Sequence, residues 1–192
     1  FGEGPDKVLE EALSMEASMG FVTKNYENYV GAVDFNEKEK ALDILAHLDV
    51  VPVSDEWTVT KPFVPIIKYG KLYGRGASDD KGPAVTALYA MKAVKDLNIP
   101  LNKNVRLILG TDEECGSSDI KYYYDREEEA PMTFSPDADF PLINVEKGSF
   151  KPEFRAEFVE DKKLPRIVSV NSGVKVNVIP DRASAVIEGI SY

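Results

Sequence analysis

The single histidine of this 192-residue chain, His47, lies two residues before an aspartate, Asp49, within the apolar run Ile44-Leu45-Ala46-His47-Leu48-Asp49-Val50-Val51-Pro52. Side chains two residues apart on a β-strand point to the same face, so we expect His47 and Asp49 to be neighbours. A carboxylate beside an imidazole fixes the ring tautomer and raises its basicity, which a metal site or an acid–base site needs. The pair predicts a site of one of these kinds, and a purely structural histidine is the competing interpretation.

Three further acidic clusters follow along the chain. Their sequences are Ser78-Asp79-Asp80-Lys81-Gly82, Asp112-Glu113-Glu114-Cys115 and Pro136-Asp137-Ala138-Asp139. Each cluster follows an expected strand, and loops at one edge of a sheet converge in space. One histidine with several carboxylates is a ligand set for Zn²⁺, Mn²⁺ or Co²⁺, with little preference among the three.

The first acidic cluster belongs to a glycine-rich segment, residues 74–83, that leads into an expected helix. A phosphate-binding loop is one interpretation, but neither the GxxxxGK[ST] nor the GxGxxG spacing is present. An aspartate that caps a proline-led helix is the structural alternative, and it explains one of Asp79 and Asp80 but not both.

The other two clusters also have structural alternatives. Thr111 and Glu114 match the spacing of a helix-capping box, and Asp137 lies in a proline-bracketed turn where aspartate is common. Cys115 is a further candidate, as a thiol nucleophile with His47 as its base. No oxyanion motif accompanies that cysteine, and cysteine is more often a small, buried apolar residue than a nucleophile.

Alternating helices and strands are expected to position these clusters. This order predicts an α/β fold, a three-layer sandwich of helices around a mostly parallel, mixed sheet. The expected helices cover residues 5–19, capped by Gly20, then 82–97 and 117–125. The expected strands cover residues 26–35, 42–51, 105–109, 133–135, 142–146 and 150–158, with a hairpin over 66–73 that turns at Tyr69-Gly70.

The pattern changes after about residue 162. Residues 167–170, 175–179 and 183–190 read as short strands without helices between them, so we expect residues 1–162 to form one domain and residues 163–192 to begin another.

Composition limits the classes of partner and the cellular location. The formal net charge is −10, from 33 acidic and 23 basic residues. This charge argues against nucleic acid or an anionic membrane as the main partner. One cysteine forms no internal disulfide, and no apolar run reaches transmembrane length, so the cytoplasm is the expected location. Composition indicates nothing about the oligomeric state.

Four motifs, in this order, resemble the co-catalytic di-zinc metallopeptidase family. They are His47-Leu48-Asp49-Val50-Val51-Pro52, the segment from Gly74-Arg75-Gly76 to Asp79-Asp80-Lys81-Gly82, Gly110-Thr111-Asp112-Glu113-Glu114, and Ser135-Pro136-Asp137-Ala138. The likeness is closest over residues 42–148 and is strongest to the dipeptidases of the peptidase V and carnosinase type. Asn177-Val178-Ile179-Pro180 is similar to a segment of that family's lid domain.

The resemblance implies a role for each motif residue. His47 and Asp137 would bind one metal, Asp79 would bridge two metals, and Glu114 would bind the second. Asp49 would orient His47, and Glu113 would act as the general base. Deacylases and carboxypeptidases of the family tend to carry glutamate at the position of Asp137, so the aspartate here favours the peptidase branch.

The resemblance further implies an enzyme that hydrolyses dipeptides or short peptides with two zinc ions, Mn²⁺ or Co²⁺ being alternatives. The family completes its second metal shell with a histidine near its C-terminus, and this chain has no other histidine. We therefore expect a fragment, with a partial catalytic domain over residues 1–162, the start of an α+β lid over 163–192, and little activity of its own. An N-acyl-amino-acid deacylase of the same family and a non-catalytic divalent-metal-binding module are the alternatives.

Overall fold

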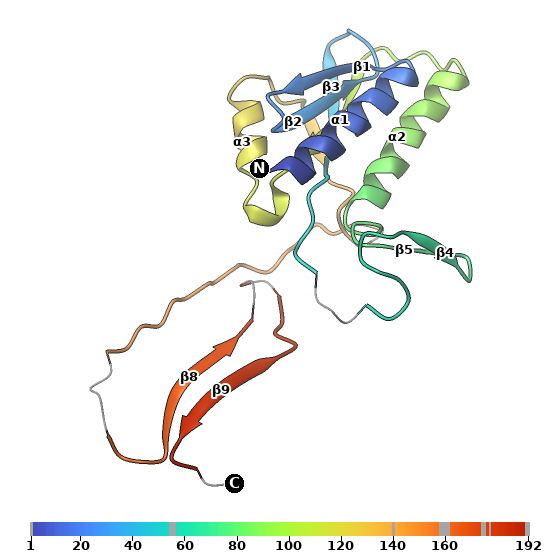
Figure 1. Ribbon diagram of the computed structural model, residues 1–192. Coiled ribbons are helices and arrows are strands. Elements are labelled where there is room, and N and C mark those ends of the chain that lie inside the picture. Colours follow the sequence, from blue (N-terminus) through green and yellow to red (C-terminus); the bar gives the residue numbers. More distant parts are fainter. Residues whose placement is uncertain are drawn as a thin grey trace. The chain divides into compact units, whose positions relative to one another are not determined.

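A computed structural model of the chain describes residues 2–53, 57–139, 141–157, 162–173, 176 and 178–190. The chain divides into two compact units, residues 1–143 and residues 144–192. Figure 1 shows the helices and the larger sheet in the first unit and a two-stranded ribbon in the second.

A five-stranded mixed sheet forms the centre of the first unit, in the order β1-β2-β6-β3-β7. Its strands are β1 (Val22–Tyr26), β2 (Val30–Asp34), β3 (Lys40–His47), β6 (Asn104–Gly110) and β7 (Met132–Phe134). β3 runs parallel to both β6 and β7, whereas β2 runs antiparallel to both β1 and β6. The carboxyl ends of β3, β6 and β7 therefore meet at one edge of the sheet, as the sequence predicted.

Helices cover both faces of this sheet, which confirms the predicted three-layer α/β fold (Figure 1). On one face, α1 (Glu3–Ser18) and α2 (Lys81–Asp96) bury Leu9, Leu13 and Leu88 against apolar strand residues. On the other face, α3 (Ser118–Tyr124) packs Tyr123 against β2 and β6. Burying apolar side chains from both helical layers against the sheet is the main stabilising contribution of such a fold.

Two predicted strands have different bounds in the structure. The strand predicted over residues 26–35 is the second half of a hairpin, because Glu27 and Asn28 adopt positive φ angles of 55° and 60° and turn the chain between β1 and β2. Such angles are typical of a tight hairpin turn. The strand predicted over residues 42–51 ends at His47, so Asp49 lies beyond it.

The hairpin predicted over residues 66–73 is confirmed as β4 (Ile66–Lys68) and β5 (Lys71–Tyr73), with its turn at Tyr69 and Gly70. A short 3₁₀ helix, η1 (Glu113–Cys115), precedes α3.

The second unit contains β8 (Arg166–Ser172) paired antiparallel with β9 (Ala183–Glu188), which confirms two of its predicted strands. The strands predicted over 142–146 and 150–157 are wrong, since these residues are irregular and mostly exposed, and a strand needs a partner for its backbone. Phe158, which ended the second of them, lies outside the described residues, as do Lys175 and Asn177 from the strand predicted over 175–179.

Among the described residues, no helix combines the length and the apolar character that crossing a membrane requires.

Candidate metal centre

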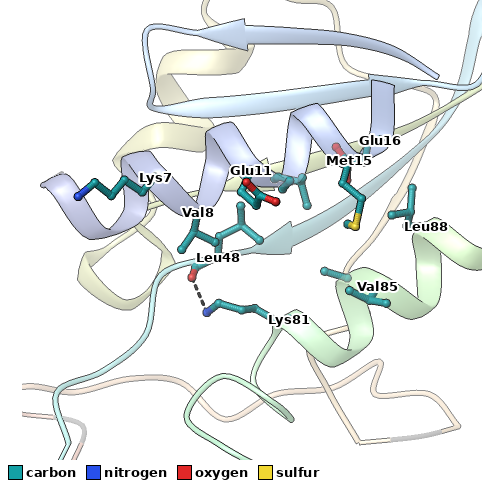
Figure 2. A pocket seen from close by; sticks show the side chains of 12 residues that line it. Lys7, Val8, Glu11, Met15, Glu16, Leu48, Lys81, Val85 and Leu88 are labelled. Atoms are coloured by element: carbon teal, nitrogen blue, oxygen red, sulfur yellow. Dashed lines mark hydrogen bonds between the residues drawn. The ribbon is translucent and has the colours of Figure 1, made fainter. Parts of the chain in front are cut away.

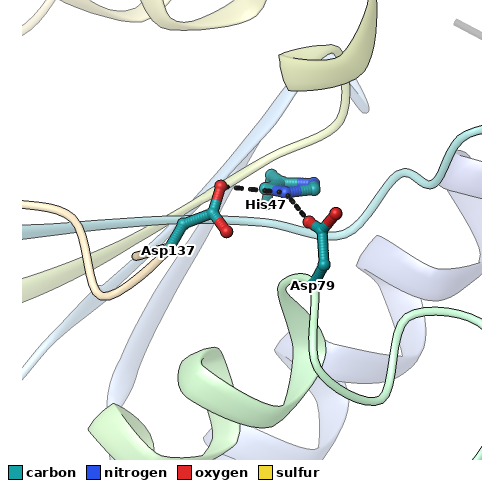
Figure 3. Close-up of side chains that lie close together, drawn as sticks. All are labelled: His47, Asp79 and Asp137. Carbon is teal, nitrogen blue, oxygen red and sulfur yellow. Dashed lines mark hydrogen bonds and ion pairs between the residues drawn. The ribbon is translucent and has the colours of Figure 1, made fainter. Parts of the chain in front are cut away.

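Four segments of the chain meet at one edge of the sheet, and three of them bring acidic side chains to His47. His47 is the last residue of β3, Glu113 begins η1 after β6, and Asp137 follows β7 in the chain. Asp79 comes from the loop that leads into α2. Figure 3 shows Asp79 and Asp137 approaching the same side of the His47 ring from different segments.

The Nε2 atom of His47 is the centre of this cluster. It lies 3.0 Å from Asp79 Oδ1, 3.4 Å from Asp137 Oδ2 and 3.9 Å from Glu113 Oε2. One ligand atom from each of His47, Asp79 and Asp137 lies within 4.8 Å of the other two. We call these three residues the His47 cluster. A nitrogen and two carboxylate oxygens at this spacing can hold one divalent ion.

Asp49 holds the other side of the imidazole. Its Oδ1 atom lies 3.3 Å from His47 Nδ1, and its backbone carbonyl oxygen lies 3.2 Å from the same nitrogen. A proton on Nδ1 that is donated to Asp49 leaves the Nε2 lone pair free for a metal, the arrangement in which a carboxylate orients a ligand histidine. His47 and Asp49 are therefore neighbours, as predicted. The reason differs, because the strand ends at His47 and the two side chains do not alternate along it.

The backbone of η1 fixes Asp49 in turn. The backbone N–H groups of Glu113 and Glu114 donate to Asp49 Oδ1 and Oδ2, at 3.2 and 3.1 Å. Burial alone would raise the pKa of Asp49, but His47 and these two N–H groups outweigh it and lower the pKa. A carboxylate that accepts two backbone N–H groups stays ionised. Asp49 thus ties the end of β3 to the loop after β6.

Glu113 and Glu114 occupy different places in this arrangement. The Glu113 carboxylate approaches His47 and is half exposed, and burial, together with the neighbouring carboxylates, raises its pKa. Glu114 is half-buried and touches the site through its backbone N–H. It is not part of the His47 cluster as the described residues form it.

The electrostatics of the cluster favour a bound cation. Burial alone would lower the pKa of His47, yet hydrogen bonding and charge from Asp49, with the charges of Asp137 and Glu113, raise it to about 9. Crowded carboxylates stabilise any positive charge placed among them, and a divalent ion supplies more charge than a proton. The donor set of the His47 cluster therefore fits a divalent metal.

Of the two capping alternatives, the one for Thr111 is wrong and the one for the consecutive aspartates is confirmed in position only. Thr111 donates its hydroxyl to the carbonyl oxygen of Tyr29 and does not cap η1, whose N-cap position is Asp112. Asp80 occupies the N-cap position of α2 without a side-chain capping bond there. Packing explains one glycine of the glycine-rich segment, because a Cβ atom on Gly82 would lie 2.3 Å from the carbonyl oxygen of Ala77.

Sequence reasoning assigned no separate role to two charged residues beside the site. Asp80 is fully buried and accepts from the backbone N–H of His47 at 3.0 Å. Lys81 donates from Nζ to the carbonyl oxygen of Leu48 at 2.6 Å, a bond drawn in Figure 2. The consecutive aspartates were the signal for Asp80, since capping explains only one of them.

Sequence reasoning also did not predict a second cluster of charged residues, which is buried. Asp43, in the middle of β3, accepts from Arg106 Nε at 2.7 Å and Arg106 Nη2 at 2.6 Å, from the Tyr124 hydroxyl at 2.9 Å and from the Ala130 backbone N–H at 3.0 Å. We call these residues the Asp43 cluster. An aspartate inside an otherwise apolar strand was its signal, because a buried carboxylate requires partners.

A cavity of about 320 Å³ lies between α1 and α2 (Figure 2). Its walls are mostly apolar and include Val8, Met15, Leu48 and Leu88, with Glu16 also among the lining residues. It does not contain the residues of the His47 cluster.

Known proteins match this chain over most of its length. The family model described as "Peptidase family M20/M25/M40" matches residues 44–187. The chain is 44% identical over 191 residues to the putative dipeptidase YtjP of Bacillus subtilis (strain 168), which covers 98% of this chain and 41% of that protein. It is 38% identical over 188 residues to the Beta-Ala-Xaa dipeptidase of Lactobacillus delbrueckii subsp. lactis, with 98% and 40% covered.

Among solved structures, the chain resembles the M20 family metallo-carboxypeptidase Sso-CP2 from Sulfolobus solfataricus. The TM-score is 0.64 and the identity 32%, over 71% of this chain and 33% of that chain. The chain spans about 40% of the length of the curated relatives it matches.

Proposed function

Because the chain belongs to the peptidase family M20/M25/M40, we propose that it carries the metal-binding and proton-transfer residues of a metal-dependent dipeptidase. The observation that supports this most directly is the geometry of the His47 cluster, backed by Asp49 on the other side of the ring and by Glu113 3.9 Å from Nε2. Two relatives are named as dipeptidases, which favours dipeptides as the substrate class.

The family implies a divalent metal cofactor. We propose zinc as that metal, with Mn²⁺ or Co²⁺ as alternatives that the same nitrogen and oxygen donors accept. His47, Asp79 and Asp137 would hold the first ion. Asp79 would bridge to a second ion, which Glu114 would also bind. The second site has fewer ligands from the residues assigned here, so it is expected to bind more weakly.

The residues of this chain divide the chemistry among them. A bound divalent ion supplies Lewis acidity, which lowers the pKa of water toward about 7 and polarises a peptide carbonyl. Asp49 keeps Nε2 of His47 turned toward the cluster. Glu113 is half exposed beside that cluster, so its carboxylate is placed to take a proton from water and to deliver it to the leaving amine.

The alternatives receive less support. A thiol mechanism would need His47 as the base of Cys115, but both ring nitrogens of His47 face carboxylate groups. A deacylase of the same family would more often carry glutamate at position 137. A non-catalytic metal-binding module has no need for a free carboxylate such as Glu113 beside the cluster.

A metal titration of the 192-residue chain tests the metal sites. Calorimetry with Zn²⁺ or Mn²⁺ is expected to give one tight site and one weak or undetectable site. His47→Ala is expected to abolish the tight site. Two equally tight sites would contradict the ligand assignment, and so would no binding by the parent chain.

Hydrolysis assays test the activity. A chain of the relatives' length that contains these residues is expected to hydrolyse a panel of dipeptides with Zn²⁺ or Mn²⁺ and to lose activity with a chelator. The 192 residues alone are expected to show little turnover. Activity that resists the chelator and disappears in Cys115→Ala would establish the thiol mechanism instead.

Three further proposals accompany the function. Residues 1–162 would be part of the catalytic domain, and residues 163–192 the beginning of a lid. The protein would act in the cytoplasm, which cell fractionation can test. Small peptides, and neither nucleic acid nor membranes, would be its partners.

A further inference from the structure

Within the part of the chain that the structure describes, the end of β3 has no strand partner on the β7 side. The backbone N–H of Leu48 donates to the carbonyl oxygen of Gly110, toward β6. Successive N–H groups of an extended chain point in opposite directions, so the N–H of His47 points toward the β7 side. There β7 pairs only with Leu42, Asp43 and Ile44 and ends at Phe134. The N–H of His47 therefore needs an acceptor that the sheet does not provide.

Asp80 supplies that acceptor. Its Oδ2 atom accepts from the N–H of His47 at 3.0 Å, and its side chain is fully buried. Among the atoms that the structure describes, Oδ1 of Asp80 has no hydrogen-bond partner. A buried carboxylate with an unsatisfied oxygen is costly for the fold, so stability alone is a poor reason for an aspartate at this position.

Lys81 makes a second link between the same two segments. It is the first residue of α2, and its Nζ atom donates to the carbonyl oxygen of Leu48, the residue after His47. Asp80 and Lys81, at the start of α2, thus hold His47, the last residue of β3, and Leu48, which follows it. Asp79, which faces His47 Nε2 at 3.0 Å, directly precedes this pair of links.

We propose that Asp80 is a positioning residue of the metal centre, which acts by fixing the backbone of His47 relative to Asp79. The two adjacent aspartates then have separate tasks. Asp79 faces the metal position, while Asp80 turns inward and sets the spacing between the nitrogen and oxygen ligands. This inference rests on the proposed metal centre, and it assigns to Asp80 a contribution to metal affinity without direct contact with the ion.

Metal titration of the 192-residue chain and its variants tests this role. Removal of a group that orients a metal ligand typically lowers affinity about 10–100-fold, so Asp80→Ala is expected to weaken Zn²⁺ binding at the tight site by that factor. Asp80→Asn keeps an acceptor oxygen for the His47 N–H and is expected to restore most of the affinity. Hydrogen exchange of the His47 amide, in the metal-free chain, is expected to accelerate in Asp80→Ala and to stay slow in Asp80→Asn.

Asn104→Ala is the matched control. Asn104 is buried, and its side-chain oxygen accepts from the backbone N–H of Asn36 at 3.1 Å. It pairs with Lys40 at the far end of β3 from His47. We expect Asn104→Ala to lower the melting temperature without changing the Zn²⁺ affinity of the folded chain.

The outcomes separate this proposal from the proposed function. If the parent chain binds Zn²⁺ and Asp80→Ala binds it equally well, the positioning role is wrong and the metal centre stands. If both Asp80→Ala and Asn104→Ala weaken binding to the same extent, the effect is general destabilisation and the proposal is overturned. Should Asp80→Ala fail to fold, Asp80→Asn decides the question. If the folded Asp80→Asn chain binds Zn²⁺ weakly and its His47 amide exchanges fast, the acceptor role of position 80 is contradicted. Failure of the parent chain to bind metal would overturn the metal centre itself.

Discussion

Strand β3 carries two charged clusters that differ in how their carboxylate charge is balanced. The Asp43 cluster balances its carboxylate inside the protein, with an Arg106 side chain that is 1% exposed and with donors from Tyr124 and Ala130. The His47 cluster, four residues further along, gathers carboxylates around one imidazole and opens toward solvent through Asp79 and Asp137. A buried charge that is already paired has no need of an ion and is destabilising only if its partner is removed, whereas an excess of one charge at the edge of a sheet is suited to an added ion.

The largest expected effect is on catalysis at the His47 cluster. In a chain of the relatives' length, Glu113→Gln is expected to lower kcat about 10²–10⁴-fold, because an amide does not accept the proton of the attacking water. Metal content, measured by elemental analysis, is expected to stay unchanged. Near-normal kcat with normal metal content would show that Glu113 is not the base.

The next effect concerns the Asp43 cluster and stability alone. Arg106→Met leaves the Asp43 carboxylate buried without its cation, which typically costs about 3–5 kcal/mol of unfolding free energy. Urea denaturation measures this loss. The affinity of the remaining folded chain for Zn²⁺ is expected to match that of the parent. A selective loss of Zn²⁺ affinity without destabilisation would show that the two clusters are not independent.

Metal addition is expected to stabilise through the His47 cluster. At a free Zn²⁺ concentration of 100 times Kd, binding to the folded state adds about 2.7 kcal/mol of stability. For a chain of this size, the melting temperature rises about 2–4 °C for each kcal/mol. Thermal denaturation of parent and His47→Ala chains with and without Zn²⁺ provides the measurement. An equal rise in both chains would place the binding elsewhere.

The remaining expected effect is a change in pH dependence alone, and it concerns a third buried carboxylate, that of Glu16 on α1. Glu16 is 2% exposed, and its Oε2 atom has no hydrogen-bond partner among the described residues. Burial raises its pKa from 4.5 to about 8. Between these values the folded chain keeps a proton that the unfolded chain releases, so the unfolding free energy decreases as pH rises from 4.5 to 8.

Glu16→Gln removes this dependence, since glutamine does not ionise. The variant is expected to gain stability relative to the parent at pH 9, compared with their difference at pH 5, because each pKa unit of a shift corresponds to about 1.4 kcal/mol. Denaturation at both pH values measures the difference. A difference that is the same at pH 5 and pH 9 would show that Glu16 is ionised in the folded chain.

The sequence predicted the α/β fold because apolar periodicity identifies long buried elements such as α2 and β6. It did not predict β1, whose residues are half-buried or exposed and include Lys24 and Asn25. It placed strands over residues 142–146 and 150–158, whose described part contains apolar residues but pairs with no strand among the described residues. Periodicity reports which residues avoid water, but pairing decides which of them form a sheet.

For the site, residue types were enough to select His47, Asp49 and the three acidic clusters, and the resemblance to the di-zinc metallopeptidases singled out Asp79, Glu113 and Asp137 within those clusters. The place of Glu114 depends on where β6 ends, and the bond between Asp80 and the His47 backbone depends on where β3 and β7 end. These strand ends are set by three-dimensional pairing. Sequence spacing alone therefore does not reveal which carboxylate binds an ion and which one supports the backbone.

The His47 cluster draws its members from positions 47, 79 and 137, at the end of β3 and in two loops that are far apart in the chain. Bringing such distant segments together costs loop-closure entropy, which must be offset before any ion can be held by all three. An ion therefore contributes little to the early steps of folding, and its effect falls on the completed native state. Contacts that form after the transition state slow unfolding more than they speed folding, so a bound metal should act mainly by prolonging the lifetime of the folded chain.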